Sequence, residues 1–197
     1  MKSHKTFDQL SDMKVLLLFT LWSFIVQLFL SNDSPFFGLA HRVDSAWFFM
    51  EGKAFMYGLR PYVEFTDFKG PLIWTFYGIG YLFSPFNYHG MYVVSGVFYA
   101  LTLFFNYKKA KIFLQGNLAS LAATLPMIFV YFFPWFHFET RSEDLMLPFV
   151  AISLYALFKR IYAEERNDMI DFLMLGGCFT TLVMMKYNVA AAQGVIV

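Results

Sequence analysis

Six apolar runs alternate with short polar segments along this 197-residue chain. A helix that crosses a membrane needs about 20 consecutive apolar residues, and most of these runs approach that length. The pattern therefore predicts an all-α fold, in which the chain forms a polytopic bundle of membrane helices. The runs cover residues 15–30, 71–86, 91–107, 118–136, 145–162 and 170–197.

The run at 71–86 differs from the other five. It begins with Pro71, contains Gly78 and Gly80, and carries Pro85 near its end. It offers about 14 apolar positions where a full span needs about 20. We therefore expect an interfacial or re-entrant helix here and about five transmembrane helices in all, at 15–30, 91–107, 114–135, 146–162 and from about 170 onwards.

The basic residues predict the orientation of this bundle, because Lys and Arg concentrate in short cytoplasmic loops. If 71–86 does not cross, all three basic clusters fall on one side and the N-terminus is cytoplasmic. The first outer loop then covers about 31–90 and the second about 136–145. The alternative is six spans, with the cluster at 108–111 outside. The clusters are Lys2/Lys5/Lys14, Lys108/Lys109/Lys111 and Lys159/Arg160/Arg166.

Composition supports a membrane protein and excludes several other classes. Hydrophobic residues make up 58% of the chain and charged residues 15%, where a soluble domain carries about 25% charged residues. A net charge of +1 indicates no nucleic-acid partner. Cys178 is the only cysteine, so no disulfide can form within the chain. The chain stops inside an apolar run, and we expect residues 1–197 to be the N-terminal part of a longer transmembrane module.

The first outer loop concentrates charge beside the membrane, where its solvation cost makes a functional role the default hypothesis. Residues 43–58 fit a helix with Asp44 and Glu51 on one side. We expect its apolar arc to lie on the bilayer surface and its carboxylates to face an outer cavity. The alternative is a surface helix with solvated acids. The apolar arc consists of Ala46, Trp47, Phe49, Met50, Ala54 and Tyr57.

The same loop continues with Arg60, Asp67 and Lys69 before Pro71. Pro71 can begin a helix, because a proline in the first turn loses no helical hydrogen bond. Asp67 just before it has a structural explanation in the favourable interaction of a carboxylate with the helix dipole. Lys69 gains nothing from that dipole, so we expect it to have an anionic partner, either a carboxylate or a phosphate.

The second outer loop also carries charge, at Glu139, Arg141, Glu143 and Asp144. Helix capping explains part of this pattern, with Ser142 or Thr140 as the N-cap and the two later acids in the first turn. Capping and chemistry are compatible at these positions. In the last apolar run, Lys186 is predicted to be an intramembrane cation that faces the bundle or a cavity.

These motifs resemble the GT-C glycosyltransferases, above all the bacterial relatives of protein O-mannosyltransferases and of lipid A aminoarabinose transferases. The resemblance is carried by Asp44 after the first span, by an acid-bearing second loop, by Met185-Lys186, and by the segment 62–74, Tyr-Val-Glu-Phe-Thr-Asp-Phe-Lys-Gly-Pro-Leu-Ile-Trp. The family often has Lys-Pro-Pro-Leu where this chain has Lys69-Gly-Pro-Leu. An Arg often follows the first Asp by three residues, and here that position is Trp47.

The resemblance implies a glycosyltransferase of the bacterial cytoplasmic membrane. It would move a sugar from a polyprenyl-phosphate-linked donor to a hydroxyl or a phosphate-bearing group of a glycan, lipid or protein acceptor at the outer face. The resemblance identifies no certain cofactor and leaves a divalent metal open. The implied roles are general base for Asp44, second-loop acid for Glu143 or Asp144, and donor phosphate binding for Lys69 and Arg60, with Glu51, Asp67 and Arg141 as further candidates.

Two other classes of function remain open at this stage. A flippase or transporter component for a lipid-linked sugar would carry acids and lysines within its spans, and only Lys186 fits that pattern. A truncated relative without activity is the other alternative, because the apolar run at 194–197 ends abruptly.

Overall fold

A computed structural model describes residues 10–37, 43–65, 67–132, 140–163 and 167–196 of the chain. These residues form eight helices, and their only β pairing is an isolated bridge between Pro61 and Phe65. The predicted all-α fold is confirmed. In chain order the helices are α1 (Asp12–Leu30), α2 (Val43–Met56), α3 (Pro71–Phe83), α4 (His89–Ala110), α5 (Gly116–Phe132), α6 (Ser142–Tyr162), α7 (Asp168–Val183) and α8 (Tyr187–Ile196).

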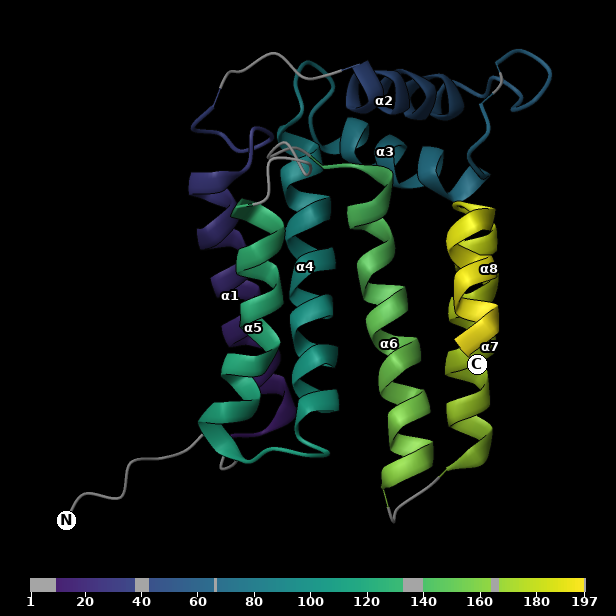
Figure 1. Cartoon of the computed structure of the whole chain (residues 1–197). Coiled ribbons are helices and arrows are strands. Elements are labelled where there is room, and N and C mark those ends of the chain that lie inside the picture. The colour runs from purple at the N-terminus through teal and green to yellow at the C-terminus, as the bar shows by residue number, and fades with distance from the viewer. Residues whose placement is uncertain (1–9, 38–42, 66, 133–139, 164–166, 197) are drawn as a thin grey trace.

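Five helices, α1 and α4 to α7, run side by side as a bundle (Figure 1). Within it, α4 packs against α1, α5 and α6, and α7 packs against α6. By length and composition, α1, α4 and α6 are able to cross a membrane, as judged over the described residues. The flanking α5 and α7 have 17 and 16 residues and lie alongside them. The prediction of a polytopic membrane bundle is confirmed.

The helix α3 lies across one end of the bundle instead of along it, and α2 covers α3 (Figure 1). It begins at Pro71, as predicted, and has only 13 residues. A crosswise helix of this length is what a non-spanning, interfacial segment requires. One apolar core joins this layer to the bundle; it includes Phe48, Ile73, Trp74, Tyr77, Met91, Leu145, Leu182 and Met185.

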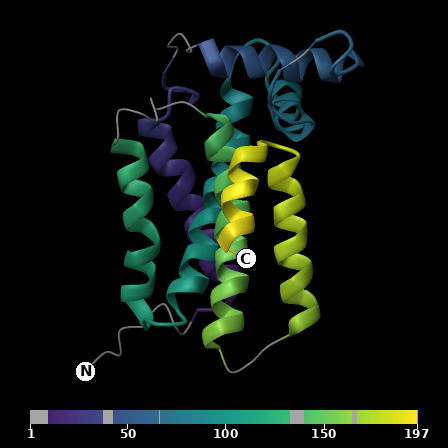
Figure 2. The ribbon, with the colours of Figure 1, turned by 45° about the vertical axis from the view of Figure 1, so that its right-hand side comes forward.

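The two ends of the bundle differ in chemistry. The α2–α3 layer, the start of α6 and the α7–α8 turn lie at one end (Figures 1 and 2). The described basic residues Lys14, Lys108 and Lys159 belong to helix ends at the opposite end. This places the described parts of both predicted outer loops on the same side. Lys2, Lys5, Arg42 and Arg166 lie outside the described residues.

The last apolar run is not a single helix, contrary to our expectation. The helix α7 ends at Val183, and α8 begins at Tyr187 and turns back beside α7 (Figure 2). Lys186 therefore lies in a turn at the α2–α3 end and not within a span. The turn is stabilised because the carbonyls of Met185 and Met184 accept hydrogen bonds from Gly70 and Leu72, at 2.9 and 3.2 Å. Carbonyls at a helix end need such partners.

The helix α2 is present as predicted, but Glu51, which we expected to face an outer cavity, is buried instead. Trp47 and Met50 of the apolar arc are exposed on the protein surface, at 55% and 60%. The buried face carries Ser45, Phe48, Phe49, Glu51 and Gly52. It packs on α3, whose buried Trp74 donates a hydrogen bond to Glu51. Gly52 permits this contact, because a Cβ there would lie 2.6 Å from the backbone nitrogen of Gly78.

We predict that Gly52→Ala destabilises the fold by about 1–3 kcal/mol, the usual cost of overpacking. The added methyl group meets backbone atoms of Tyr77 and Gly78 at 2.6 to 2.7 Å, and backbone cannot yield as a flexible side chain can. Gly176→Ala is the matched control, since nothing lies within 4 Å of a Cβ at that position. Thermal unfolding in detergent measures both variants. Equal melting temperatures for the two would contradict the close packing of α2 on α3.

Candidate functional site

A polar pocket of about 350 Å³ opens at the α2–α3 end of the bundle. Its walls come from the start of α2, the segment before α3, the start of α6 and the α7–α8 turn. The fold thus brings together residues that are far apart in the sequence, among them five of the predicted site residues: Asp44, Asp67, Lys69, Arg141 and Glu143. The other lining residues are Val43, Trp47, Phe48, Ser142 and Lys186.

Asp44 lies in the first turn of α2 with its side chain exposed at the pocket. The next residue fixes this end of the helix, because the Ser45 hydroxyl donates a hydrogen bond to the Thr140 carbonyl at 3.0 Å. The Tyr77 hydroxyl of α3 donates to the same carbonyl at 2.8 Å. One carbonyl before α6 therefore holds α2 and α3 in register with the second outer loop.

Asp33, which our sequence analysis did not select, completes this connection. Its carboxylate is almost fully buried and accepts hydrogen bonds from the backbone N–H and the hydroxyl of Thr140, at 2.7 and 2.6 Å. Hydrogen bonds to a charged acceptor are among the stronger hydrogen bonds in proteins. Asp33 thus ties the segment after α1 to the segment before α6, and so positions the residues that line the pocket from both sides.

Lys69 enters the pocket from the short segment before α3, with its Nζ atom 5.7 Å from the ring centroid of Phe48. The following residue holds the segment in place: the Gly70 N–H donates to Met185, and a Cβ there would collide with the Met184 carbonyl at 1.9 Å. A proline at position 70 would lack that N–H. This contact explains why the chain has Lys-Gly-Pro at this site.

Lys186 forms an ion pair with Glu143 across the pocket. Ser142 orients the same carboxylate, donating to its Oε2 at 2.8 Å. Lys186 faces a cavity, as predicted, but it does so from the α7–α8 turn. Among the residues that the structure describes, the ionisable side chains lining the pocket are balanced in charge, with three acids (Asp44, Asp67 and Glu143) and three bases (Lys69, Arg141 and Lys186).

The two acids of the second loop have different surroundings. Asp144 is buried; its Oδ1 accepts from the Tyr99 hydroxyl and its Oδ2 from the Arg141 N–H, both at 2.8 Å. It therefore caps α6, whose N-cap is Arg141 and not Ser142 or Thr140 as expected. Glu143 is the acid that faces the pocket.

Arg60, the second predicted phosphate ligand, does not line the pocket. Its side chain is exposed, and its Nε lies 3.6 Å from a carboxylate oxygen of Glu64. His137 and Glu139 of the second loop lie outside the described residues. Among the residues that the structure does describe, no three His, Cys, Asp or Glu side chains are grouped to hold a metal ion.

Glu51 lies buried behind the pocket, where its Oε2 accepts a hydrogen bond from the Trp74 indole at 2.8 Å. Burial raises the pKa of Glu51 to about 7, and the negative charge of Asp67 adds to this effect. Hydrogen bonding by Trp74 and Trp47 and the positive charge of Lys69 act in the opposite direction. The folded protein therefore keeps this carboxyl protonated well above the pH at which an unfolded chain releases the proton.

This raised pKa predicts a pH-dependent effect of Glu51→Gln on stability. Between the unfolded pKa of 4.5 and the folded pKa of about 7, the folded state binds more protons, so the wild type loses stability as the pH rises. Glutamine still accepts from Trp74 but carries no charge. We expect the variant to match the wild type near pH 5 and to melt at a higher temperature above pH 7. A melting-temperature difference that is constant from pH 5 to 8 would contradict the raised pKa.

A comparison with known families identifies the type of protein that carries this pocket. The model of the dolichyl-phosphate-mannose-protein mannosyltransferase family matches residues 69–194, well over half of the chain. The chain belongs to this family. The match begins at Lys69 and includes Glu143 and Lys186, whereas Asp44 and Trp47 precede it. Searches of curated proteins and of solved structures gave no match.

Membership of the mannosyltransferase family confirms the resemblance to membrane glycosyltransferases of the GT-C type. The family implies a lipid-linked sugar donor and a membrane setting, in agreement with the apolar helices. The pocket is the place where described residues of the matched region, Lys69, Glu143 and Lys186, meet the start of α2.

Proposed function

We propose that this pocket transfers a sugar from a polyprenyl-phosphate-linked donor to an acceptor hydroxyl at the outer face of the bacterial cytoplasmic membrane. The observation that carries the proposal is the pocket itself, in which an exposed carboxylate, Asp44, shares one cavity with Lys69 and Lys186. A carboxylate provides a base for the hydroxyl, and the two ammonium groups provide charge for a phosphate.

The proposed reaction is a displacement at the anomeric carbon of the donor sugar. The acceptor oxygen forms the new bond to that carbon while the bond from the carbon to the phosphate oxygen breaks. The electron pair of the broken bond leaves with the polyprenyl phosphate, and Asp44 takes the proton of the acceptor hydroxyl. General-base catalysis of this kind contributes about 10²–10⁴-fold.

The cations of the pocket stabilise the leaving group in this proposal. A phosphate gains negative charge as the bond breaks, and fixed positive groups beside it lower the barrier. Lys69 is held by the backbone contact of Gly70, and Lys186 by its ion pair with Glu143. Binding of the donor would exchange the Glu143 partner of Lys186 for the phosphate, and Glu143 would then be available to the sugar.

The position of the pocket suits a donor that is anchored in a bilayer. It opens at the end of the bundle beside the crosswise helix α3, where a phosphate can lie at the membrane surface and its prenyl chain between the helices. Lys14, Lys108 and Lys159, near the ends of α1, α4 and α6, lie at the opposite end of the bundle, which supports a cytoplasmic N-terminus and an outer pocket.

Proteoliposomes that contain a polyprenyl-phosphate donor with a radiolabelled sugar test this function against the flippase alternative. A transferase releases polyprenyl phosphate and moves the label to a water-soluble or acceptor-bound product. A flippase moves the intact donor between leaflets and leaves the bond between sugar and phosphate unbroken. Redistribution of the donor without release of polyprenyl phosphate would reject the transferase proposal.

A further inference from the structure

We infer that Trp47 is the stacking surface for an uncharged sugar of the acceptor, so that the acceptor is a glycan whose hydroxyl reaches Asp44. The inference rests on the proposed function and names the acceptor class of the same pocket. It is carried by the position of one exposed indole next to the proposed base, and by the absence of a cation among the α2 residues that line the pocket.

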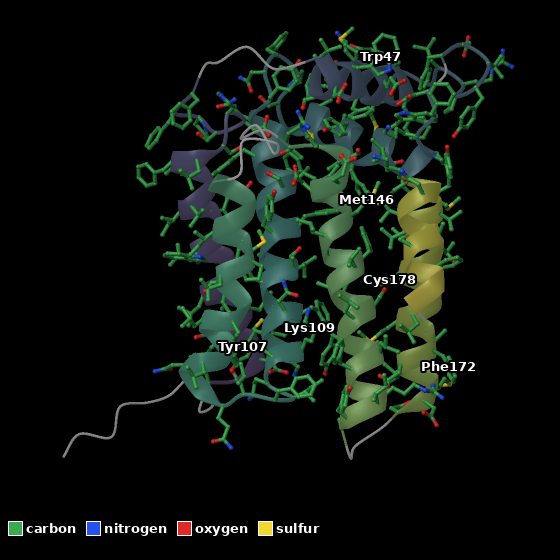
Figure 3. The ribbon with its side chains drawn as sticks, in the orientation of Figure 1. Trp47, Tyr107, Lys109, Met146, Phe172 and Cys178 are labelled. Atoms are coloured by element: carbon green, nitrogen blue, oxygen red, sulfur yellow. The ribbon has the colours of Figure 1, made fainter. Side chains whose placement is uncertain are left out.

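Trp47 follows Asp44 by one turn of α2, and both residues line the pocket. Side chains three residues apart on a helix are neighbours, with Cβ atoms about 5–6 Å apart. Figure 3 shows Trp47 at the outer end of the molecule, far from Phe172 at the opposite end. A molecule that brings a hydroxyl to Asp44 therefore extends over the indole.

The indole is exposed at 55% because α2 packs on α3 through its other face. Trp47 thus contributes little to the core, and an aromatic surface of this size gains when a ligand covers it. The C–H face of a pyranose ring fits such a surface, and its hydroxyl groups can donate to the Asp44 carboxylate. An indole beside a carboxylate accordingly provides both contacts that a neutral sugar requires.

Charge distinguishes a neutral sugar from a phosphate-bearing acceptor. Four α2 residues line the pocket, Val43, Asp44, Trp47 and Phe48, and none of them is a cation. The three cations among the described lining residues come from the other walls, where the proposal places the donor phosphate. An anionic acceptor on the α2 wall would face the Asp44 carboxylate at close range, and like charges at such distances repel.

Binding of simple glycosides tests the inference without requiring transfer. Saturation-transfer-difference NMR is recorded on the full chain in nanodiscs with the methyl glycosides of glucose, galactose and N-acetylglucosamine as probes. Signals are expected from the ring C–H protons of at least one glycoside. They should disappear in Trp47→Ala and persist in Trp47→Tyr. Met50→Ala is the matched control, because Met50 is equally exposed on α2 but does not line the pocket.

Kinetics of transfer provide the second readout, with the best-binding glycoside as acceptor. Trp47→Ala is expected to raise the KM for the acceptor about tenfold, equivalent to about 1.4 kcal/mol of binding, with a smaller effect on kcat. Trp47→Tyr should restore most of the loss. If the indole only stabilised the fold, Trp47→Ala would lower the melting temperature and leave the KM for the acceptor unaltered.

Separate results would overturn the inference and the proposed function. Preferential binding or glycosylation of a Ser/Thr peptide or of glycerol 3-phosphate would reject Trp47 as the stacking surface for an acceptor sugar, even if transfer occurs. Glycoside binding that survives Trp47→Ala would reject it as well. Glycoside binding that depends on Trp47, in a protein that never cleaves the donor, would support the sugar site and reject the transferase.

Discussion

Sugar transfer is expected to fall by about 10²-fold or more when Asp44 is replaced by Asn, because the variant can no longer take up the proton of the acceptor hydroxyl. Asparagine preserves the size of the side chain and most of its hydrogen bonding, so the start of α2 should remain in place. The loss should appear in kcat, since the proton moves in the transition state and not on binding. Transfer of labelled sugar in membranes, normalised to the amount of protein, measures it.

A matched control for Asp44→Asn is Glu64→Gln, which removes a carboxylate from the same outer loop but outside the pocket. It should leave transfer near the wild-type rate. If Asp44→Asn also transferred sugar at that rate, Asp44 would have a structural role only. Glu143 would then be the next candidate for the base, because it faces the pocket whereas Glu51 and Asp144 are buried behind it.

The sequence predicts the local features of this site well, because these depend on patterns within a few residues. Apolar runs predict the bundle, Pro71 predicts the start of α3, and the shortness of 71–86 predicts a helix that lies across the bundle end. Because charged residues are scarce in the chain, those gathered in the outer loops also stand out as candidates for the site. Asp44, Lys69 and Glu143 were selected on that basis together with the resemblance, and the fold brings all three to one pocket.

The sequence does not predict contacts that depend on how distant segments meet. Asp33 lies within a short polar segment after α1 and gives no signal of its own, yet it binds Thr140 across 107 positions of the chain. Likewise, Lys186 is one cation in an apolar run. Only the turn between α7 and α8, held by Gly70, brings it to the pocket.

The burial of Glu51, which we expected to face a cavity, has a similar cause. Periodicity identified an apolar arc, and we expected lipid to cover it. The opposite face carries Glu51, which as a charged residue argues against burial. The structure buries it nevertheless, because Trp74 of α3 donates a hydrogen bond to it and burial raises its pKa to about 7. A packing partner that offers a hydrogen-bond donor can therefore bury a carboxyl group that hydrophobicity alone would leave exposed.

Lys69→Ala is expected to lower kcat by about 10²-fold, comparable to the loss of one donor that stabilises a developing anion in an active site. The Nζ atom of Lys69 lies over the Phe48 ring, whereas Lys186 is paired with Glu143. Lys69→Arg keeps the charge and should retain part of the activity.

Lys53→Ala serves as the matched control, because Lys53 also lies over an aromatic ring, that of Tyr81, but does not line the pocket. Release of polyprenyl phosphate under saturating donor reports kcat directly. Equal rates for Lys69→Ala and Lys53→Ala would exclude Lys69 from the stabilisation of the leaving group and leave Lys186 and Arg141 as the cations to test.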